Sequence, residues 1–265
     1  MKILTAIQTR TGSSRFPQKV LKPLGNKPLY VTMAERIKRS SHVGQVVILT
    51  TFMPEDDIIE IISLSNGLQC FRGHPTDLLD RHYQAGIFYG ADAVVKIPSD
   101  CPLVDISVID KVIGFYIDHY PKYDYVSNLH PATFPDGNDV EIISMKSLAL
   151  SWRFADKEYE REHTTPFIWE QPDRFMIGNI RFQGCNLSMS HRWCLDYPED
   201  YTFIKTVFDE LNPKNENFGL SDILELLKVK PELLDINKKY CGVNWYRHHI
   251  GTLKTIKPEE TRIMA

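Results

Sequence analysis

The first third of the chain alternates short apolar runs with longer segments, and this alternation limits the possible folds more than any other feature. Four runs have the length and apolar content of buried strands: Ile3–Ile7, Val46–Thr51, Leu68–Phe71 and Ala93–Ile97. The segments between them are long enough to form helices that cross back over a sheet. Strands that alternate with helices in this way predict an α/β fold with a mostly parallel sheet and right-handed crossovers.

The segments between these runs carry signals that begin and end helices. Pro54 opens one helix and Gly67 ends it, since these residue types are favoured at those positions. We expect the core-facing side of this helix to hold four isoleucines: Ile58, Ile59, Ile61 and Ile62. Another helix is predicted over 76–89, with Thr76 or Asp77 as its N-terminal cap.

The loop 8–20, which leaves the first predicted strand, is rich in groups that bind phosphate. Gly12 lets the backbone approach an anion closely. Two hydroxyl groups and three cations accompany it: Ser13, Ser14, Arg10, Arg15 and Lys19. Open α/β sheets bind ligands at the carboxyl ends of their strands, where this loop is expected to lie. The loop matches neither the Walker nor the dinucleotide pattern, so its composition also allows a solvated basic loop.

Composition excludes several classes of protein. The 265 residues are 43% hydrophobic, which is enough for one sizeable core. A net charge of -3 argues against a broad surface for nucleic acid. The five cysteines are scattered and odd in number, which favours reduced thiols over disulfides or a zinc site. No signal peptide or membrane-length apolar run is evident. We therefore expect a cytoplasmic protein without membrane insertion or a nucleic-acid partner.

The fourth apolar run ends in a turn with two carboxylates. Asp100 lies between Pro98 and Pro102, at the ligand-binding edge of the predicted sheet. Asp105 precedes a helix predicted over 105–119 and is interpreted as its N-terminal cap. Capping is also an alternative role for Asp100.

The regular alternation lapses between about residues 125 and 182. A strand is predicted over 139–143, in which Asp139 and Glu141 face the same side, because alternate side chains of a strand point the same way. That side could face either solvent or substrate. In the run 159–168, Arg161 and His163 also stand two residues apart. If this run is helical, they do not share a face, so at most one of them points at a given ligand atom.

Asp196 follows a short strand predicted over 193–195 and precedes a helix that Pro198 opens. The position suits either a cap or a metal ligand. Glu199 and Asp200 are interpreted as first-turn residues that complement the helix dipole. The remaining chain is predicted to be helical, with Ser221 as a cap, and its aromatic and basic run at 245–249 is not interpreted as a metal site.

Residues 8–21 resemble the signature loop of the cytidylyltransferases that activate sugar acids, a family that includes CMP-Kdo and CMP-sialic acid synthetases. The similarity is greatest to the spore coat polysaccharide biosynthesis branch, which typically shows Gln-Ala-Arg-x-Gly-Ser-Ser-Arg-Leu-Pro-x-Lys-Val-Leu. Here Thr9 and Phe16 replace Ala and Leu. The resemblance implies that five loop residues hold the triphosphate of CTP: Gly12, Ser13, Ser14, Arg15 and Lys19. We assign Gln8 and Arg10 to the same nucleotide site.

Further motifs carry the same resemblance. The turns Ser-Asp-x-Pro-Leu and Asp-x-Pro-Glu-Asp imply that Asp100 and Asp196 bind Mg²⁺. Both carboxylates can meet only if their segments lie close together in the sheet. A Gly-x-Asp-Val-Glu run and a Glu-Arg-Glu-His run before Thr-x-Pro mark four possible substrate contacts: Asp139, Glu141, Arg161 and His163. Arg72 matches in rough position an arginine that relatives use near the base.

The resemblance covers residues 1–238 and implies a three-layer, Rossmann-like fold of the nucleotide-diphospho-sugar transferase (GT-A-like) type. It implies that the inserted segment of about 125–182 carries the dimer contact and part of the acceptor site, so we expect a homodimer. Residues 239–265 are then a C-terminal tail.

The implied activity is nucleotidyl transfer in the synthesis of surface polysaccharide precursors. An acceptor oxygen of a small molecule attacks the α-phosphorus of CTP, and pyrophosphate leaves. The residues expected to act on the phosphates and the metal are Arg15, Lys19, Asp100 and Asp196. The alternatives are a glycosyltransferase of related fold, a nucleotidyltransferase that uses another NTP, and a non-catalytic nucleotide-binding regulator. The sequence contains no Asp-x-Asp motif, which counts against the glycosyltransferase. The acceptor remains open.

Overall fold

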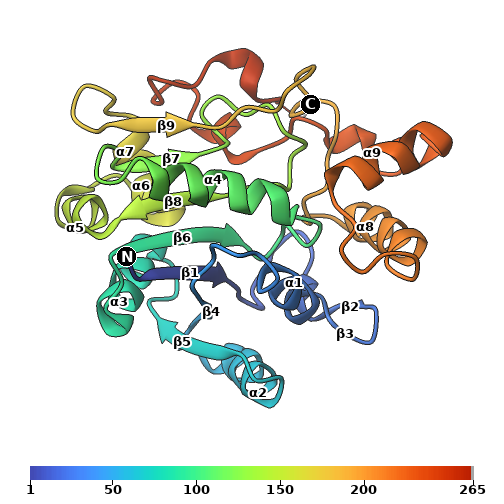
Figure 1. Cartoon of the computed structure of the whole chain (residues 1–265), viewed down its shortest axis with the longest axis horizontal. Helices are drawn as coiled ribbons and strands as arrows, with labels where there is room; N and C mark the ends of the chain where they lie inside the picture. The colour runs from blue at the N-terminus through green and yellow to red at the C-terminus, as the bar shows by residue number, and fades with distance from the viewer. Residues whose placement is uncertain (264–265) are drawn as a thin grey trace.

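A computed structural model describes residues 1–263. Its centre is a seven-stranded sheet with strand order β5-β4-β1-β6-β8-β7-β9 (Figure 1). The four apolar runs form four neighbouring strands: β1 (Ile3–Gln8), β4 (Gln45–Thr51), β5 (Gln69–Gly73) and β6 (Ala93–Pro98). All of these pair in parallel, which confirms the α/β fold predicted from their alternation with helices.

The second half of the sheet comes from the segment in which the alternation lapses. It contains β7 (Tyr125–Ser127), β8 (Glu141–Ser144) and β9 (Ile177–Asn179). β8 runs antiparallel to both β6 and β7, whereas β9 is parallel to β7. The direction of β8 explains the irregular sequence pattern, because an antiparallel neighbour needs no crossover helix.

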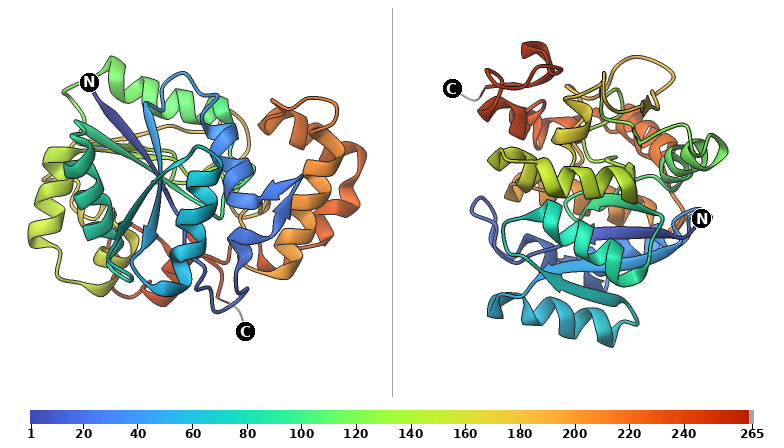
Figure 2. Two further views of the ribbon diagram at one scale, coloured as in Figure 1. Left: turned by 90° about the horizontal axis from the view of Figure 1, so that it is seen from below. Right: turned by 90° about the vertical axis from the view of Figure 1, so that its left-hand side faces the viewer.

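Helices cover both faces of the sheet (Figure 2). One face packs against α1 (Leu29–Ile37), α2 (Asp57–Ser65) and α4 (Ile106–Asp118). The other packs against α3 (Leu78–Tyr89) and α5 (Met145–Phe154). Side chains of β1 pack on both faces of the sheet. Ile3 and Ile7 face the side covered by α1, α2 and α4, and Leu4 and Ala6 face the side covered by α3 and α5. The three-layer arrangement predicted by the resemblance is therefore present.

A separate apolar cluster lies beside the sheet. It joins the hairpin of β2 (Pro23–Leu24) and β3 (Lys27–Pro28) to α8 (Pro198–Leu211) and α9 (Leu220–Val229). The cluster includes Trp193 and Leu195, in the segment that leads into α8, and Phe16 of the loop that follows β1 packs against it.

The C-terminal segment returns to the body of the molecule. It contains four short 3-10 helices: Pro231–Asp235, Lys238–Tyr240, Trp245–His248 and Pro258–Glu260. The part from Trp245 to Ile256 packs over α6 (Glu158–His163) and α7 (Pro166–Trp169). Leu253 and Ile256 are buried there. The carboxylate of Glu170 accepts hydrogen bonds from the backbone N–H groups of Lys254 and Thr255, at 2.6 and 2.9 Å.

Helix α2 differs from its prediction. Ile59 is fully buried, but 41% of Ile58 and 61% of Ile61 are exposed. The helix has apolar residues around most of its circumference, and the sheet covers only one side of it. The prediction that all four isoleucines face the core is therefore wrong for Ile58 and Ile61.

Two further local predictions are wrong. Residues 193–195 form no strand; the nearest pairing is an isolated bridge between Asp136 and Arg192. Helix α9 is capped by Gly219, whose N–H donates to the carboxylate of Asp222 at 2.8 Å, and not by Ser221. Within residues 1–263, every helix is too short or too polar to span a membrane.

Candidate active site

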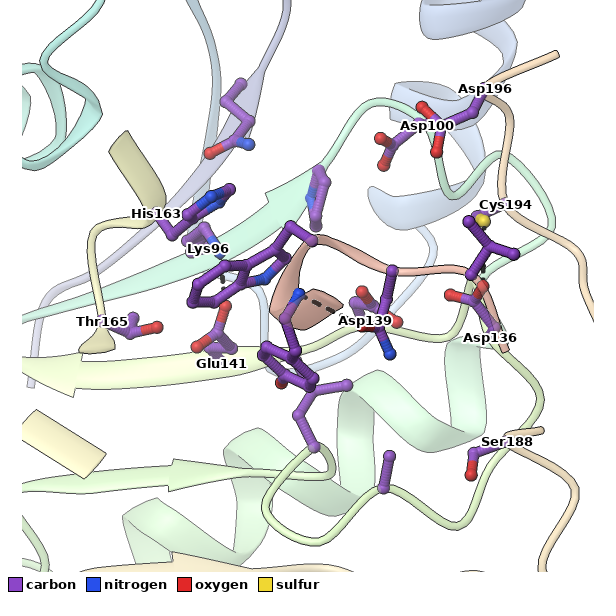
Figure 3. Close-up of a pocket in the computed structure, with 18 of the residues that line it drawn as sticks. Lys96, Asp100, Asp136, Asp139, Glu141, His163, Thr165, Ser188, Cys194 and Asp196 are labelled. Atoms are coloured by element: carbon purple, nitrogen blue, oxygen red, sulfur yellow. Dashed lines mark hydrogen bonds and ion pairs between the residues drawn. The ribbon is translucent and has the colours of Figure 1, made fainter. Parts of the chain in front are cut away.

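A cavity of about 580 Å³ opens where β1 and β6 end. This is the edge at which open α/β sheets bind ligands. Twelve of the residues predicted for the site line it: Gln8, Arg10, Gly12, Ser13, Ser14, Arg15, Lys19, Asp100, Asp139, Glu141, His163 and Asp196. The cavity has two ends, with Asp100 and Asp196 at one and Lys96, Glu141 and His163 at the other (Figure 3).

The cationic loop is fixed in shape by a buried carboxylate. Oδ1 of Asp56 accepts hydrogen bonds from both the backbone N–H and the hydroxyl group of Thr11, at 2.8 and 2.7 Å. Gln18 closes the loop from a left-handed conformation, with its N–H donating to the carbonyl of Thr11 at 3.1 Å. Between these anchors Gly12 has no atom within 4 Å of its missing Cβ, so its backbone is open to the cavity.

Asp100 and Asp196 converge on the end of this loop. The Nζ atom of Lys19 lies 2.9 Å from Oδ1 of Asp196 and 3.6 Å from Oδ2 of Asp100. Arg15 approaches Asp196 at 2.7 Å. The two carboxylates are brought together by a backbone hydrogen bond of 2.7 Å, from the N–H of Leu195 to the carbonyl of Asp100. The metal site predicted from the sequence requires the two segments to lie side by side. This hydrogen bond joins them, although residues 193–195 form no strand.

A buried arginine holds Asp196 in place. Arg192 is 1% exposed and contacts Asp136, Asp196 and Asp200 at 3.1, 3.2 and 2.9 Å. Asp200, in the first turn of α8 as expected, also accepts the backbone N–H groups of Asp196 and Tyr197, at 2.9 and 3.0 Å. Burial by itself would raise the pKa of Asp196, but Lys19, Arg15 and Arg192 hold that pKa well below its usual range. Asp196 is therefore a carboxylate at neutral pH.

The donor set fits a divalent cation bound together with phosphate. Two carboxylates, Asp100 and Asp196, already lie within reach of one ammonium group. Mg²⁺ is commonly held by one or two carboxylates, with phosphate oxygens and waters completing its coordination. Among the described residues there is no cluster of three or more His, Cys, Asp or Glu with metal-ligand geometry. An ion held by these two carboxylates would take the rest of its coordination from phosphate oxygens and waters.

A buried ion pair lines the end of the cavity that lies away from Asp100 and Asp196. Lys96 donates to Oε1 of Glu141 at 2.5 Å, and the hydroxyl group of Tyr125 donates to Oε2 at 2.7 Å. Burial would raise the pKa of Glu141, yet the ion pair with Lys96 lowers it. Lys96 lines the cavity but was not predicted, since one lysine in an apolar strand gives no functional signal.

Asp139 lies between the two ends of the cavity. Burial is the main cause that raises its pKa to about 8, and the nearby charges of Asp136 and Asp100 add to the shift. Both Asp139 and Glu141 line the cavity, so they face the same side, as predicted (Figure 3).

Stacked aromatic rings form the wall beside His163. The ring of Trp245 stacks on His163, with 3.8 Å between centroids and 15° between planes. His130 stacks on Trp169 at 4.3 Å. Burial is the first cause that lowers the pKa of His163 to about 3 and that of His130 to about 4, so both imidazoles are neutral at pH 7. Trp245 was not predicted for this site, because nothing in the order of residues places the C-terminal segment here.

Two predicted contacts lie elsewhere. The guanidinium of Arg72 contacts Asp57 at 2.6 Å and Glu60 at 3.0 Å on helix α2, and the residue is absent from the cavity wall. Arg161 binds Asp77, the cap of α3, with Nε at 2.8 Å from its carboxylate. Arg161 and His163 therefore point in different directions, and His163 is the one that reaches the cavity.

The comparisons with known proteins connect this chain with cytidylyltransferases. A family model described as Cytidylyltransferase matches residues 4–226. An uncharacterized protein of Methanocaldococcus jannaschii, MJ1063, is 32% identical over 240 residues, which are 89% of this chain and 95% of that protein. The spore coat polysaccharide biosynthesis protein SpsF of Bacillus subtilis is 27% identical over 235 residues, or 87% and 95% of the two chains. A solved cytidylyltransferase of Leptospira borgpetersenii superposes with a TM-score of 0.83 at 31% identity, over 88% of this chain and 97% of that one.

Proposed function

The chain belongs to the cytidylyltransferase family, and from this premise we propose that it transfers CMP from CTP to a sugar acid or a related small-molecule acceptor. The reaction joins the acceptor oxygen to the α-phosphorus of CTP and releases pyrophosphate. The observation that carries the proposal is the convergence of Asp100 and Asp196 on Lys19 beside the cationic loop. The relation to SpsF supports a role in making precursors of surface polysaccharides.

In this proposal the loop binds the phosphates of CTP. Gly12 offers an open backbone, and the hydroxyl groups of Ser13 and Ser14 can donate hydrogen bonds. Arg15 and Lys19 supply positive charge to the phosphates and to the departing pyrophosphate. Gln8 and Arg10 line the same wall and complete the nucleotide site. We infer no covalent intermediate with the protein, since positioning and charge stabilisation suffice for this kind of transfer.

Asp100 and Asp196 are the residues that would hold Mg²⁺. A bound Mg²⁺ would supply charge neutralisation at the phosphate that is attacked. Asp196 suits this task because its low pKa keeps it ionised. Arg192 and Asp200 position Asp196, through the side chain and the backbone respectively.

The acceptor would occupy the end of the cavity that Glu141 and His163 line, and Asp139 would lie between it and the phosphate site. Glu141 binds Lys96 and Tyr125, so it acts through the position of Lys96 and not as a free carboxylate. The neutral His163 can exchange hydrogen bonds with acceptor hydroxyl groups. A cytoplasmic location belongs to the proposal as well, in keeping with five cysteines that are all free thiols.

The test is a pyrophosphate-release assay that compares CTP with the other nucleoside triphosphates, over a panel of sugar acids, with and without Mg²⁺. We expect release with CTP, Mg²⁺ and one class of acceptor. Asp196→Asn should lower kcat by about 10²- to 10³-fold, as loss of a group that stabilises charge does. Glu199→Gln is the matched control, because Glu199 lies one turn away and pairs with Lys239 at the surface.

Full activity in Asp196→Asn would overturn the assignment of the phosphate site. Transfer from a nucleotide sugar without pyrophosphate release would instead support the glycosyltransferase. Release with another triphosphate in place of CTP would preserve the reaction type but not the base preference.

A further inference from the structure

His163 and Thr165 stand two positions apart, yet both line the end of the cavity proposed for the acceptor (Figure 3). A helix turns by about 100° per residue, so side chains two positions apart point to nearly opposite sides. The preceding pair in α6 follows this rule, since Arg161 binds Asp77 while His163 reaches the cavity. The helix must therefore be broken at Thr164 for Thr165 to share a wall with His163.

The break is a tight turn at Thr164. Helix α6 ends at His163 and α7 begins at Pro166, so only two residues join the two helices. The backbone N–H of Thr165 donates to the carbonyl group of His163 at 2.9 Å, a hydrogen bond between residues two positions apart. Thr164 has a φ of 73° and a ψ of -49°. These angles and this hydrogen bond define the rare, strained form of the γ-turn.

Threonine is an unfavourable residue for this conformation. A positive φ brings Cβ too close to the backbone, and the branched side chain of Thr164 increases the crowding. Among residues 1–263, Gln18 is the only other non-glycine residue with a positive φ, and it closes the cationic loop at the phosphate end of the cavity. The backbone is therefore strained at one point beside each end of the cavity. Such conformations concentrate at functional sites, where the surrounding structure compensates for the strain.

The packing around the turn holds it in place. Thr164 is fully buried, and Thr165 is only 3% exposed. The hydroxyl group of Thr164 lies 3.5 Å from Nδ1 of His82, a fully buried residue of α3. Tyr159 of α6 and Ile168 of α7 belong to one core cluster, so both helices are anchored on either side of the turn. The core can therefore compensate for the strain at Thr164.

The two side chains that flank the turn contact different parts of the cavity wall. His163 stacks on Trp245, with 3.8 Å between ring centroids. The hydroxyl group of Thr165 accepts the indole N–H of Trp169 at 3.1 Å and also hydrogen-bonds with the carboxylate of Glu141. The turn therefore joins the stacked aromatic rings to the buried ion pair at this end of the cavity.

We propose that Thr164 is a positioning residue for the acceptor, because its strained turn aims both His163 and Thr165 into the same end of the cavity. A relaxed helical backbone would direct one of these two side chains away from the cavity. Thr164 is itself buried and does not line the cavity, so it acts through its two neighbours. The chain thus loses some stability at Thr164 and gains a fixed acceptor wall. This inference rests on the proposed location of the acceptor.

Two matched variants, Thr164→Ala and Thr164→Gly, differ by one methyl group and separate strain from packing. Both lose the hydroxyl and methyl groups of threonine, but alanine keeps the strain, whereas glycine adopts a positive φ without steric cost. We expect Thr164→Gly to melt about 2–4 °C above Thr164→Ala, the shift that relief of strain at one residue predicts.

Activity should follow the reverse order. The assay is pyrophosphate release with CTP, Mg²⁺ and the sugar acid of the panel that gives the highest rate. Thr164→Gly frees the turn to relax, so it should lose about 10- to 100-fold in kcat/KM for the acceptor. Thr164→Ala keeps the turn and should stay close to wild type. KM for CTP should be unchanged in both variants. A purely structural role would instead make activity follow stability.

A further measurement needs neither nucleotide nor acceptor. The ring current of Trp245 shifts the imidazole proton signals of His163 upfield in the NMR spectrum, because the two rings are stacked. The variant His163→Gln identifies these signals by their loss. Thr164→Gly should move them toward the positions of free histidine, and Thr164→Ala should leave them in place.

Three results would overturn the proposal. The first is a Thr164→Ala variant more stable than Thr164→Gly, since the turn would then not be strained. The second is an equal kcat/KM for the acceptor in the two variants. The third is an unchanged set of His163 signals in Thr164→Gly. If no acceptor reacts but the His163 signals move as expected, the proposed function fails, whereas the positioning of His163 by Thr164 is supported.

Discussion

Replacing Lys96 with methionine should destabilise this protein even though Lys96 lies in a cavity wall. The residue is 8% exposed, and its ammonium group pairs with Glu141, which is 2% exposed. Methionine keeps the apolar stem of the side chain but removes the charge. Glu141 would then remain buried with Tyr125 as its hydrogen-bond donor but without a cation.

The expected loss of stability follows from the burial of the ion pair between Lys96 and Glu141. Removing one partner of a buried ion pair typically lowers the free energy of unfolding by about 3–5 kcal/mol. Because Tyr125 continues to donate to Glu141, we expect the lower end, about 3 kcal/mol, a large part of the total stability of a typical domain. The double variant Lys96→Met/Glu141→Gln removes both charges, so it should be more stable than Lys96→Met by about 2 kcal/mol.

Urea denaturation at several pH values measures these differences. The folded state lowers the pKa of Glu141, so the ion pair contributes its full stability above the ordinary pKa of a glutamate, about 4.3. That contribution is lost as the pH falls through the lower folded pKa. The difference in the free energy of unfolding between wild type and Lys96→Met should therefore decrease at acidic pH. A cost below about 1 kcal/mol at pH 7, or a double variant no more stable than Lys96→Met, would refute the reasoning.

Two further substitutions in the cavity give independent tests. Asp139→Asn should raise the free energy of unfolding above pH 8 relative to wild type, because burial, with Asp136 and Asp100, raises the pKa of Asp139 to about 8. The wild-type carboxyl therefore contributes stability that is fully present below about pH 4 and is lost as the pH rises through 8. If urea denaturation gave wild type and Asp139→Asn the same pH dependence of the free energy of unfolding, this account would be contradicted. Trp245→Ala should raise KM for the acceptor and leave KM for CTP unchanged, since Trp245 stacks on His163 at the end away from the cationic loop. A change in KM for CTP that exceeds the change in KM for the acceptor would show that the Trp245 ring contacts the nucleotide instead.

Several local features could be predicted from the sequence. The apolar runs became β1, β4, β5 and β6 because strand formation follows from a local pattern of burial. Asp105 was interpreted as a cap, and its Oδ1 accepts the N–H groups of Ser107 and Val108 at 2.6 and 3.1 Å. Such contacts lie within a few residues of one another, so a short stretch of sequence contains both partners.

Other features depended on contacts that no short stretch contains. The apolar periodicity of α2 could not indicate that Ile58 and Ile61 lie outside, because several of its faces are apolar and the sheet covers one. Arg72 was assigned to the nucleotide site from its rough position. Its actual partners, Asp57 and Glu60, depend on how α2 packs beside β5.

The sequence by itself determined the layered α/β fold, the cationic loop after β1 and the carboxylates available to it. Only the tertiary structure decided that Asp100 meets Asp196 and that Trp245 closes the wall beside His163. The physical reason is that secondary structure arises from interactions between near neighbours in the chain. The distance between groups separated by many residues depends on the path of the whole backbone, and here the path of 192–196 and of the C-terminal segment fixed it.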